Sequence, residues 1–183
     1  MIAKIRNILK SMKAIVVFFL LLFILTPKVK AQETDYKAYS LYVYNFMKYV
    51  DWPENKNEGD FTIVIIGKSK IEKELKTLAA QKKIRGRNII VKSINSVDEI
   101  NDCHLLYITK EKSSVIKDLN VKIKDKSILI VGEKEGLARK GAALSFATLD
   151  NDELSFDINK RSIEEHKLKI SSALIKLGEL VVE

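Results

Sequence analysis

The chain has 183 residues, of which 46% are hydrophobic and 31% are charged, and its formal net charge is +8 at neutral pH. That length suits one ordinary domain and excludes two domains that each have a full hydrophobic core. The composition is that of a soluble globular protein. Whether the positive charge marks a nucleic-acid-binding protein depends on where it lies in the chain.

The N-terminal segment has the order of a secretory signal peptide. Four basic residues precede an apolar run at 14–26, and the small residue Ala31 stands before Gln32. This order is typical of an exported protein, so we expect cleavage near Ala31-Gln32 and a periplasmic location. The alternative is an uncleaved membrane anchor over residues 14–26. As a helix that run spans only about 20 Å of a hydrocarbon core about 30 Å thick, which favours cleavage.

Removal of this segment changes the charge balance. Residues 1–31 hold six of the 32 Lys and Arg residues and none of the 24 Asp and Glu residues, so the remainder carries 26 basic and 24 acidic residues. A nucleic-acid-binding protein keeps a clustered basic surface, so we expect no nucleic-acid partner. The one local basic cluster, KKIRGR at 82–87, is interpreted as a solvated loop.

Cys103 is the only cysteine, so no disulfide can form within one molecule, although an exported protein enters an oxidising compartment. The residue leads into the apolar segment 104–109, and we expect the thiol to be buried as a small hydrophobic group. The mature domain, residues 32–183, must therefore be stabilised by its core alone.

Strand and helix patterns then alternate along the chain. An aromatic-rich helix at 36–50 ends before Pro53, because the residue before a proline leaves the helical region. Apolar runs typical of buried strands follow, separated by helical patterns that include a capping box at 96–99. The strands are expected at 61–67, 88–94, 104–109 and 127–132, and the longer helices at 70–81 and 112–120. This alternation predicts a single α/β domain with a mostly parallel sheet and helices on both faces.

The pattern changes in the last forty residues. Two strand-like segments flank the turn-forming triplet 150–152, which predicts an antiparallel hairpin at the sheet edge. A short helix is expected at 160–166. A longer closing helix, capped by Ser171, is expected over 170–181.

No catalytic constellation emerges from the sequence. Gly67-Lys68-Ser69 lacks the earlier glycine of a phosphate-binding loop, because Thr62 occupies that position. Cys103 and His104 are adjacent and would point to opposite faces of a strand, which disfavours a metal site. We therefore expect a protein that is not an enzyme and needs no metal or other cofactor.

Three stretches remain as candidate binding residues, each with a structural alternative. Asp51 and Trp52 end the first helix, where the indole either covers the core or offers contact area to a partner. Gly132 and Gly136 follow a strand, where α/β proteins often bind ligands, or they form a plain surface loop. Lys169, Ser171 and Ser172 either cap the last helix or hold a phosphate or carboxylate.

Taken together, six segments resemble the YfiR family of exported bacterial proteins. The resemblance extends over essentially the whole mature chain, about residues 34–182. The segments read NFxKYVxWP (45–53), FxIxIxG (61–67), CHLLYI (103–108), ILIVGxxxG (128–136), FxIN (156–159) and LKISSxL (168–174). The resemblance implies a dimeric periplasmic repressor that binds the outward-facing domain of an inner-membrane diguanylate cyclase, in the cyclic-di-GMP pathway. Some relatives also use cysteine pairs for redox control. Here only Cys103 matches such a position, which leaves an intermolecular pair as the one possibility.

Other function classes stay open from the sequence. The partner could instead be an envelope sensor kinase. The domain could also be a periplasmic sensor of a small molecule, with residues 132–136 and 169–172 as the walls of its site. An enzyme of unknown chemistry is the third alternative, and no residue pattern supports it.

Overall fold

The structure is a computed structural model that describes residues 34–124 and 126–183. The predicted signal peptide, its cleavage point at Ala31-Gln32 and the alternative anchor at 14–26 lie outside the described residues. Within the described part of the chain, no helix combines the length and apolar character needed to cross a membrane.

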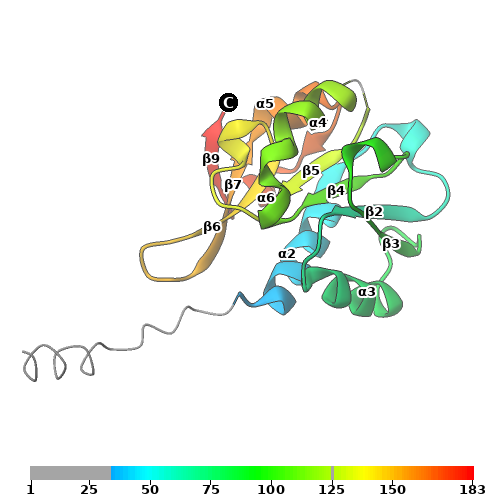
Figure 1. The fold of residues 1–183 in the computed structure, drawn as a ribbon, viewed down its shortest axis with the longest axis horizontal. Helices are drawn as coiled ribbons and strands as arrows, with labels where there is room; N and C mark the ends of the chain where they lie inside the picture. The colour runs from blue at the N-terminus through cyan, green and yellow to red at the C-terminus, as the bar shows by residue number, and fades with distance from the viewer. Residues whose placement is uncertain (1–33, 125) are drawn as a thin grey trace, which may run out of the picture. The chain divides into compact units, whose positions relative to one another are not determined.

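A seven-stranded sheet forms the centre of the domain, with the strand order β3-β2-β4-β5-β6-β7-β9 (Figure 1). Strands β3, β2, β4, β5 and β6 run parallel to one another, and β7 is antiparallel to β6. The predicted α/β class with a mostly parallel sheet is therefore confirmed. The strand bounds are β2 (Phe61–Ile66), β3 (Ile89–Ile94), β4 (Leu105–Ile108), β5 (Leu129–Gly132), β6 (Leu144–Thr148), β7 (Leu154–Asn159) and β9 (Glu179–Val182).

Helices cover both faces of this sheet, as the continuous apolar strands predict. Because side chains alternate along a strand, Ile63 and Ile65 of β2 join one apolar cluster, while Val64 and Ile66 join another. Helices α2 (Tyr36–Tyr49) and α3 (Ile71–Gln81) pack on the first cluster. Helix α4 (Ile116–Lys122), which continues the 3-10 helix η3 (Lys110–Val115), packs on the second.

The predicted capping box is confirmed, and Gly67 forms a tight turn. The capping box opens the 3-10 helix η2 (Val97–Glu99), because the Glu99 side chain accepts a hydrogen bond from the Ser96 backbone N–H at 2.9 Å. Gly67 turns the chain after β2 with a φ of 93°. A side chain there would approach the Thr109 hydroxyl to 2.3 Å, so the glycine serves a close contact.

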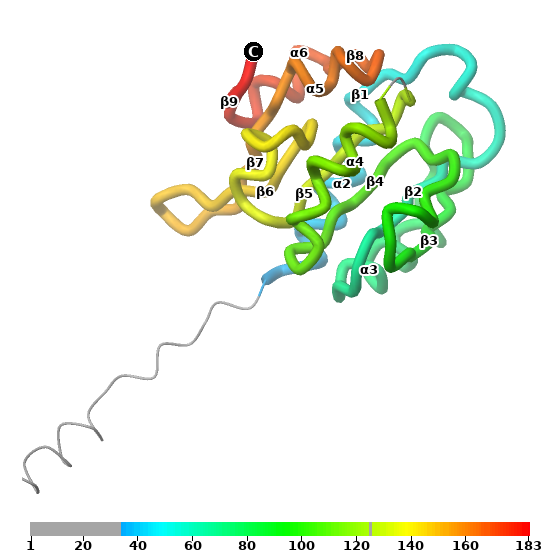
Figure 2. The backbone as a smooth tube through the Cα atoms, turned by 45° about the horizontal axis from the view of Figure 1, so that its top comes forward, coloured from blue at the N-terminus to red at the C-terminus, as the bar shows by residue number. Residues whose placement is uncertain are grey.

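Helix α2 ends one residue before the predicted boundary. Val50 leaves the helix because Val50–Asp51 forms a short strand, β1, that pairs antiparallel with β8 (Lys169–Ile170). The next residues form a loop that contains the 3-10 helix η1 (Glu54–Lys56). Figure 2 shows this loop at one end of the domain and the tip of the β6–β7 hairpin at the opposite end.

The C-terminal prediction needs one correction. The hairpin, the short helix α5 (Lys160–Glu165) and the Ser171 cap are confirmed. The closing helix, however, is the single turn α6 (Ser172–Ile175), and the residues after Gly178 form strand β9. Strand β9 pairs in parallel with β7, so β9 and not the hairpin forms this sheet edge. Backbone pairing of these last residues with the edge of β7 therefore outweighs the helical spacing of their apolar side chains.

Candidate functional site

Two of the three candidate stretches meet at the short ribbon of β1 and β8. Asp51 lies directly opposite Lys169 in the antiparallel register, and the backbone N–H of Ser171 donates to the Tyr49 carbonyl at 2.9 Å. Both Asp51 and Lys169 are exposed. Residues that are 118 positions apart in the chain therefore form one polar surface at the end of α2.

The serine pair that follows β8 acts as a helix cap. Ser171 Oγ accepts a hydrogen bond from the Leu174 backbone N–H at 3.2 Å, and Ser172 is the first and exposed residue of the one-turn helix α6. This contact uses one of the N–H groups that could otherwise hold an anion. The capping role, which was one of the two alternatives from the sequence, therefore accounts for the positions of these serines.

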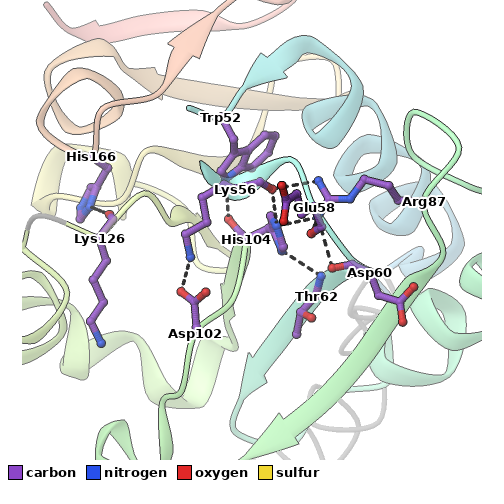
Figure 3. A network of polar contacts seen from close by, with 10 residues as sticks. All are labelled: Trp52, Lys56, Glu58, Asp60, Thr62, Arg87, Asp102, His104, Lys126 and His166. Carbon is purple, nitrogen blue, oxygen red and sulfur yellow. Dashed lines mark hydrogen bonds and ion pairs between the residues drawn. The ribbon is translucent and has the colours of Figure 1, made fainter. Parts of the chain in front are cut away.

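Trp52 lies beneath this surface, with only 6% of its area exposed. Its indole Nε1 donates to the backbone carbonyl of His104 at 3.2 Å (Figure 3). Its ring packs edge-on against Phe61 with the centroids 5.0 Å apart. The indole thus covers the end of the core beside the start of β4. A partner that binds at this end of the core would therefore contact the exposed residues beside Trp52 and not the indole itself.

The loop after Trp52 is held from inside by Arg87. The guanidinium donates to four backbone carbonyls of this loop. Three of them are those of Lys56 and Glu58 at 3.0 Å and of Asp60 at 3.2 Å (Figure 3), and the fourth is that of Gly59 at 2.7 Å. A planar guanidinium has five N–H donors in a fixed arrangement, so one arginine side chain can bind several carbonyls at once. One side chain from another part of the sequence therefore fixes the path of residues 56–60.

His104 provides the second anchor of the same loop. The Thr62 backbone N–H donates to Nδ1 at 3.0 Å, and Nε2 lies 2.9 Å from the Lys56 carbonyl and 2.8 Å from Arg87 Nη2. Burial lowers the pKa of His104, and the positive charge of Arg87 beside the ring lowers it further. A second ring proton would oppose the Thr62 N–H and add charge beside Arg87.

These contacts present an acidic surface to solvent. We call β1, residues 52–60 and the anchors Arg87 and His104 the Trp52 corner. Its exposed acidic side chains are those of Asp51, Glu54, Glu58 and Asp60. Asp51 is paired with Arg85, whereas Lys56 is largely covered and paired with Asp102. The corner therefore presents acidic side chains to solvent. Beneath them lie the buried indole of Trp52 and the partly buried guanidinium of Arg87, which hold the loop in place.

A family model described as YfiR/HmsC-like matches residues 36–179, which is most of the chain and includes the Trp52 corner. The chain belongs to the YfiR/HmsC-like family. This finding agrees with the resemblance seen in the six sequence segments. No curated protein matches the chain.

The third candidate stretch of this YfiR-like domain lies elsewhere. Gly132 ends β5 opposite Ile108, the last residue of β4, whereas Trp52 contacts the residue that precedes β4. A side chain at Gly132 would come within 2.5 Å of Leu137, so this glycine allows close packing. Gly136 turns the chain with a φ of 71°. The structure does not bring these glycines together with the other candidate residues.

Buried polar groups accompany that loop. Glu133 is buried and accepts a hydrogen bond from the Tyr36 hydroxyl at 2.8 Å through Oε1. Glu133 Oε2 and the Tyr107 hydroxyl are buried and have no hydrogen-bond partner among the described residues. Burial raises the pKa of Tyr107, and the nearby Glu133 carboxyl raises it further. Tyr107 and Glu133 therefore interact at the buried side of this loop.

Cys103 is buried in the apolar cluster beneath α4, as predicted. Burial raises the pKa of its thiol to about 12. His104 lies on the other side of the strand against Phe61, which confirms that the adjacent residues point to opposite faces. A buried, protonated thiol is a poor nucleophile. In the described residues, no three His, Cys, Asp or Glu side chains gather as a metal site.

Two residues of this site were missed from the sequence. The interpretation of residues 82–87 as a solvated loop holds for Arg85 but is wrong for Arg87, which is partly buried and organises the Trp52 corner. His104 was considered only as a metal ligand. The one local signal was the Arg-Gly-Arg sequence, because Gly86 has a φ of 81° and the tight turn sends the two arginines to different partners.

Proposed function

We propose that this protein is a periplasmic regulator that binds the outward-facing domain of an inner-membrane signalling protein and lowers its activity. Membership in the YfiR/HmsC-like family carries this proposal, because the family is known for regulating diguanylate cyclases. A diguanylate cyclase is therefore the partner that we propose first. The role requires binding alone and no reaction by the domain itself.

The Trp52 corner is the surface that we propose for this contact. Its exposed carboxylates and the neighbouring Lys169 offer charged groups, and Arg87 and His104 hold the backbone beneath them. A preorganised loop loses little conformational entropy when a partner binds. The acidic character predicts that the partner surface is basic.

Deletion and complementation test the proposal in cells. We expect loss of the gene to raise cellular cyclic di-GMP and the wild-type gene to restore it. The double variant Glu54→Lys, Glu58→Lys should fail to restore it. The matched variant Asp150→Lys, Glu153→Lys changes the same charge at the tip of the β6–β7 hairpin and should restore it. An unchanged cyclic di-GMP level after deletion would contradict a cyclase partner and leave an envelope sensor kinase as the alternative.

Export and dimerisation belong to the same proposal. N-terminal sequencing of the protein from the cell envelope should begin at Gln32, whereas an intact N-terminus in the membrane fraction would support the anchor at 14–26. Sedimentation of the purified protein should give a homodimer. A second candidate function, binding of a small molecule, is favoured by a separate feature of the fold.

A further inference from the structure

A cavity of about 530 Å³ opens between α4, α5, β9 and the 3-10 helix η4 (Ala138–Lys140). It shares no lining residue with the Trp52 corner or with the candidate binding residues predicted from the sequence. This volume lies within the range of small-molecule sites, about 300–1,000 Å³. The cavity is therefore large enough for a metabolite.

The charged lining of this cavity is mostly positive. Lys124, Arg139, Lys140 and Arg161 line it, with Glu165 as the one carboxylate among its lining residues. None of these four cations forms an ion pair with a carboxylate in the described part of the chain. They come from three segments that the fold brings together. Since the mature chain is almost neutral, this concentration of charge does not follow from its composition.

One acid outside the lining reduces the charge in part. The carboxyl of Asp157 interacts electrostatically with Arg139, and burial raises the pKa of Asp157. Asp157 therefore offsets part of the charge of Arg139. The other three cations have no such interaction with it. The cavity therefore keeps a positive excess.

The floor of the cavity is polar, buried and fixed. Ser162 and Asn159 are 4% and 6% exposed. Their side chains donate to the carbonyls of Gly141 at 2.9 Å and Ala138 at 2.8 Å, respectively. These bonds tie η4 to the start of α5. As a result, Arg139 and Lys140 project from a backbone that is held in place against the helix that carries Arg161.

Gly141 makes this arrangement possible. It adopts a φ of 113°, and a side chain there would approach Asn120 Nδ2 to 2.2 Å. Asn120 instead donates to the Gly141 carbonyl at 3.3 Å. The opposite wall is held by His166, whose Nδ1 donates to the Lys126 carbonyl at 2.9 Å (Figure 3). The cavity is thus built before any ligand enters.

We propose that this cavity binds a small molecule that carries phosphate. A phosphate monoester has a charge of about −1.5 to −2 at neutral pH, which suits several cations better than the single charge of a carboxylate. Arginine side chains from η4 and α5 can each bind phosphate oxygens through two N–H groups, and the lysines add point charges. This site goes beyond the regulator function, and it would give the domain a ligand input independent of the partner surface.

Calorimetric titration with inorganic pyrophosphate, at constant ionic strength, tests the site. The chain should bind the probe, and Lys124→Ala, Lys140→Ala should weaken the association constant at least about tenfold, which equals about 1.4 kcal/mol. The control Lys73→Ala, Lys117→Ala removes the same two charges from exposed positions on α3 and α4. It should change the constant by less than about twofold.

The two possible sources of phosphate are separated by a vesicle assay. A phospholipid headgroup would make the chain sediment with phosphatidylglycerol vesicles and not with phosphatidylcholine vesicles, and the Lys124, Lys140 variant would lose this binding. A free phosphate compound would give the calorimetric signal without sedimentation. Absence of both signals would overturn the proposal, and so would equal weakening by the two double variants, because that result would indicate diffuse surface charge.

Discussion

Two arginines on one tight turn have unequal roles, although the sequence places them only two positions apart. Arg85 is exposed and reaches Asp51 and the Val50 carbonyl, whereas Arg87 binds the inner side of the 56–60 loop. Charge-assisted hydrogen bonds to buried or constrained carbonyls stabilise more than surface ion pairs do. Composition alone cannot separate these roles, because the difference is set by the partner loop.

Replacement of Arg87 tests this difference. We expect Arg87→Ala to lower the free energy of unfolding by about 2 kcal/mol, since four carbonyls lose their donor. Arg85→Ala should cost less than about 1 kcal/mol. Urea denaturation measures both, and Arg87→Lys should not restore stability because an ammonium group cannot reproduce the fork. Equal losses in the two alanine variants would contradict the anchoring role.

Acidification should loosen the Trp52 corner through His104. Burial lowers the pKa of His104 in the folded protein, so the unfolded chain binds the proton more readily. The contribution of His104 to stability is then fully present above the unfolded pKa of about 6.5 and is lost as the pH falls through the folded value. We expect His104→Gln to lose less stability than the wild type between pH 7.5 and pH 5.5 in urea denaturation. Identical losses over that interval would show that His104 is not the titrating group.

At the scale of elements, continuous apolar runs predicted the parallel strands correctly because β2, β4 and β5 are covered on both faces. The last strand was missed for a different reason. Ile170, Leu174 and Leu177 follow helical spacing, yet only Leu174 of the three is buried. Strand β9 is defined by its pairing with β7, which a local pattern does not contain.

Gly178 marks the point where the helical turn gives way to that strand. A side chain at this position would come within 2.4 Å of the Phe156 ring. We expect Gly178→Ala to destabilise the domain by about 1–3 kcal/mol, because the core has no room for the added methyl group. Leu177→Ala, at a side chain that is 67% exposed, should stay within about 0.5 kcal/mol of the wild type. A Gly178→Ala protein as stable as the wild type in urea would contradict the close packing of β9.

At the scale of the whole molecule, the family and the fold class predicted from the sequence are confirmed, but the sequence did not show which of the candidate stretches meet. Asp51 and Lys169 come together only because β1 pairs with β8, and Gly132 lies at the other end of β4. The cavity lined by Arg139 and Arg161 gave no sequence signal, since its cations are scattered over three segments. Surfaces built from distant residues require the fold to be known.

The central claim is that the Trp52 corner binds a membrane signalling protein, and in-cell photo-crosslinking tests it most directly. A photoreactive residue would be placed at Glu58 in the exposed loop and, as a control, at Asn151 in the exposed tip of the β6–β7 hairpin. We expect Glu58 to capture one membrane-spanning cyclase or kinase and Asn151 to capture none. Capture of that protein from Asn151 and not from Glu58 would contradict the assigned surface, and capture of no membrane protein from either position would contradict the regulator function.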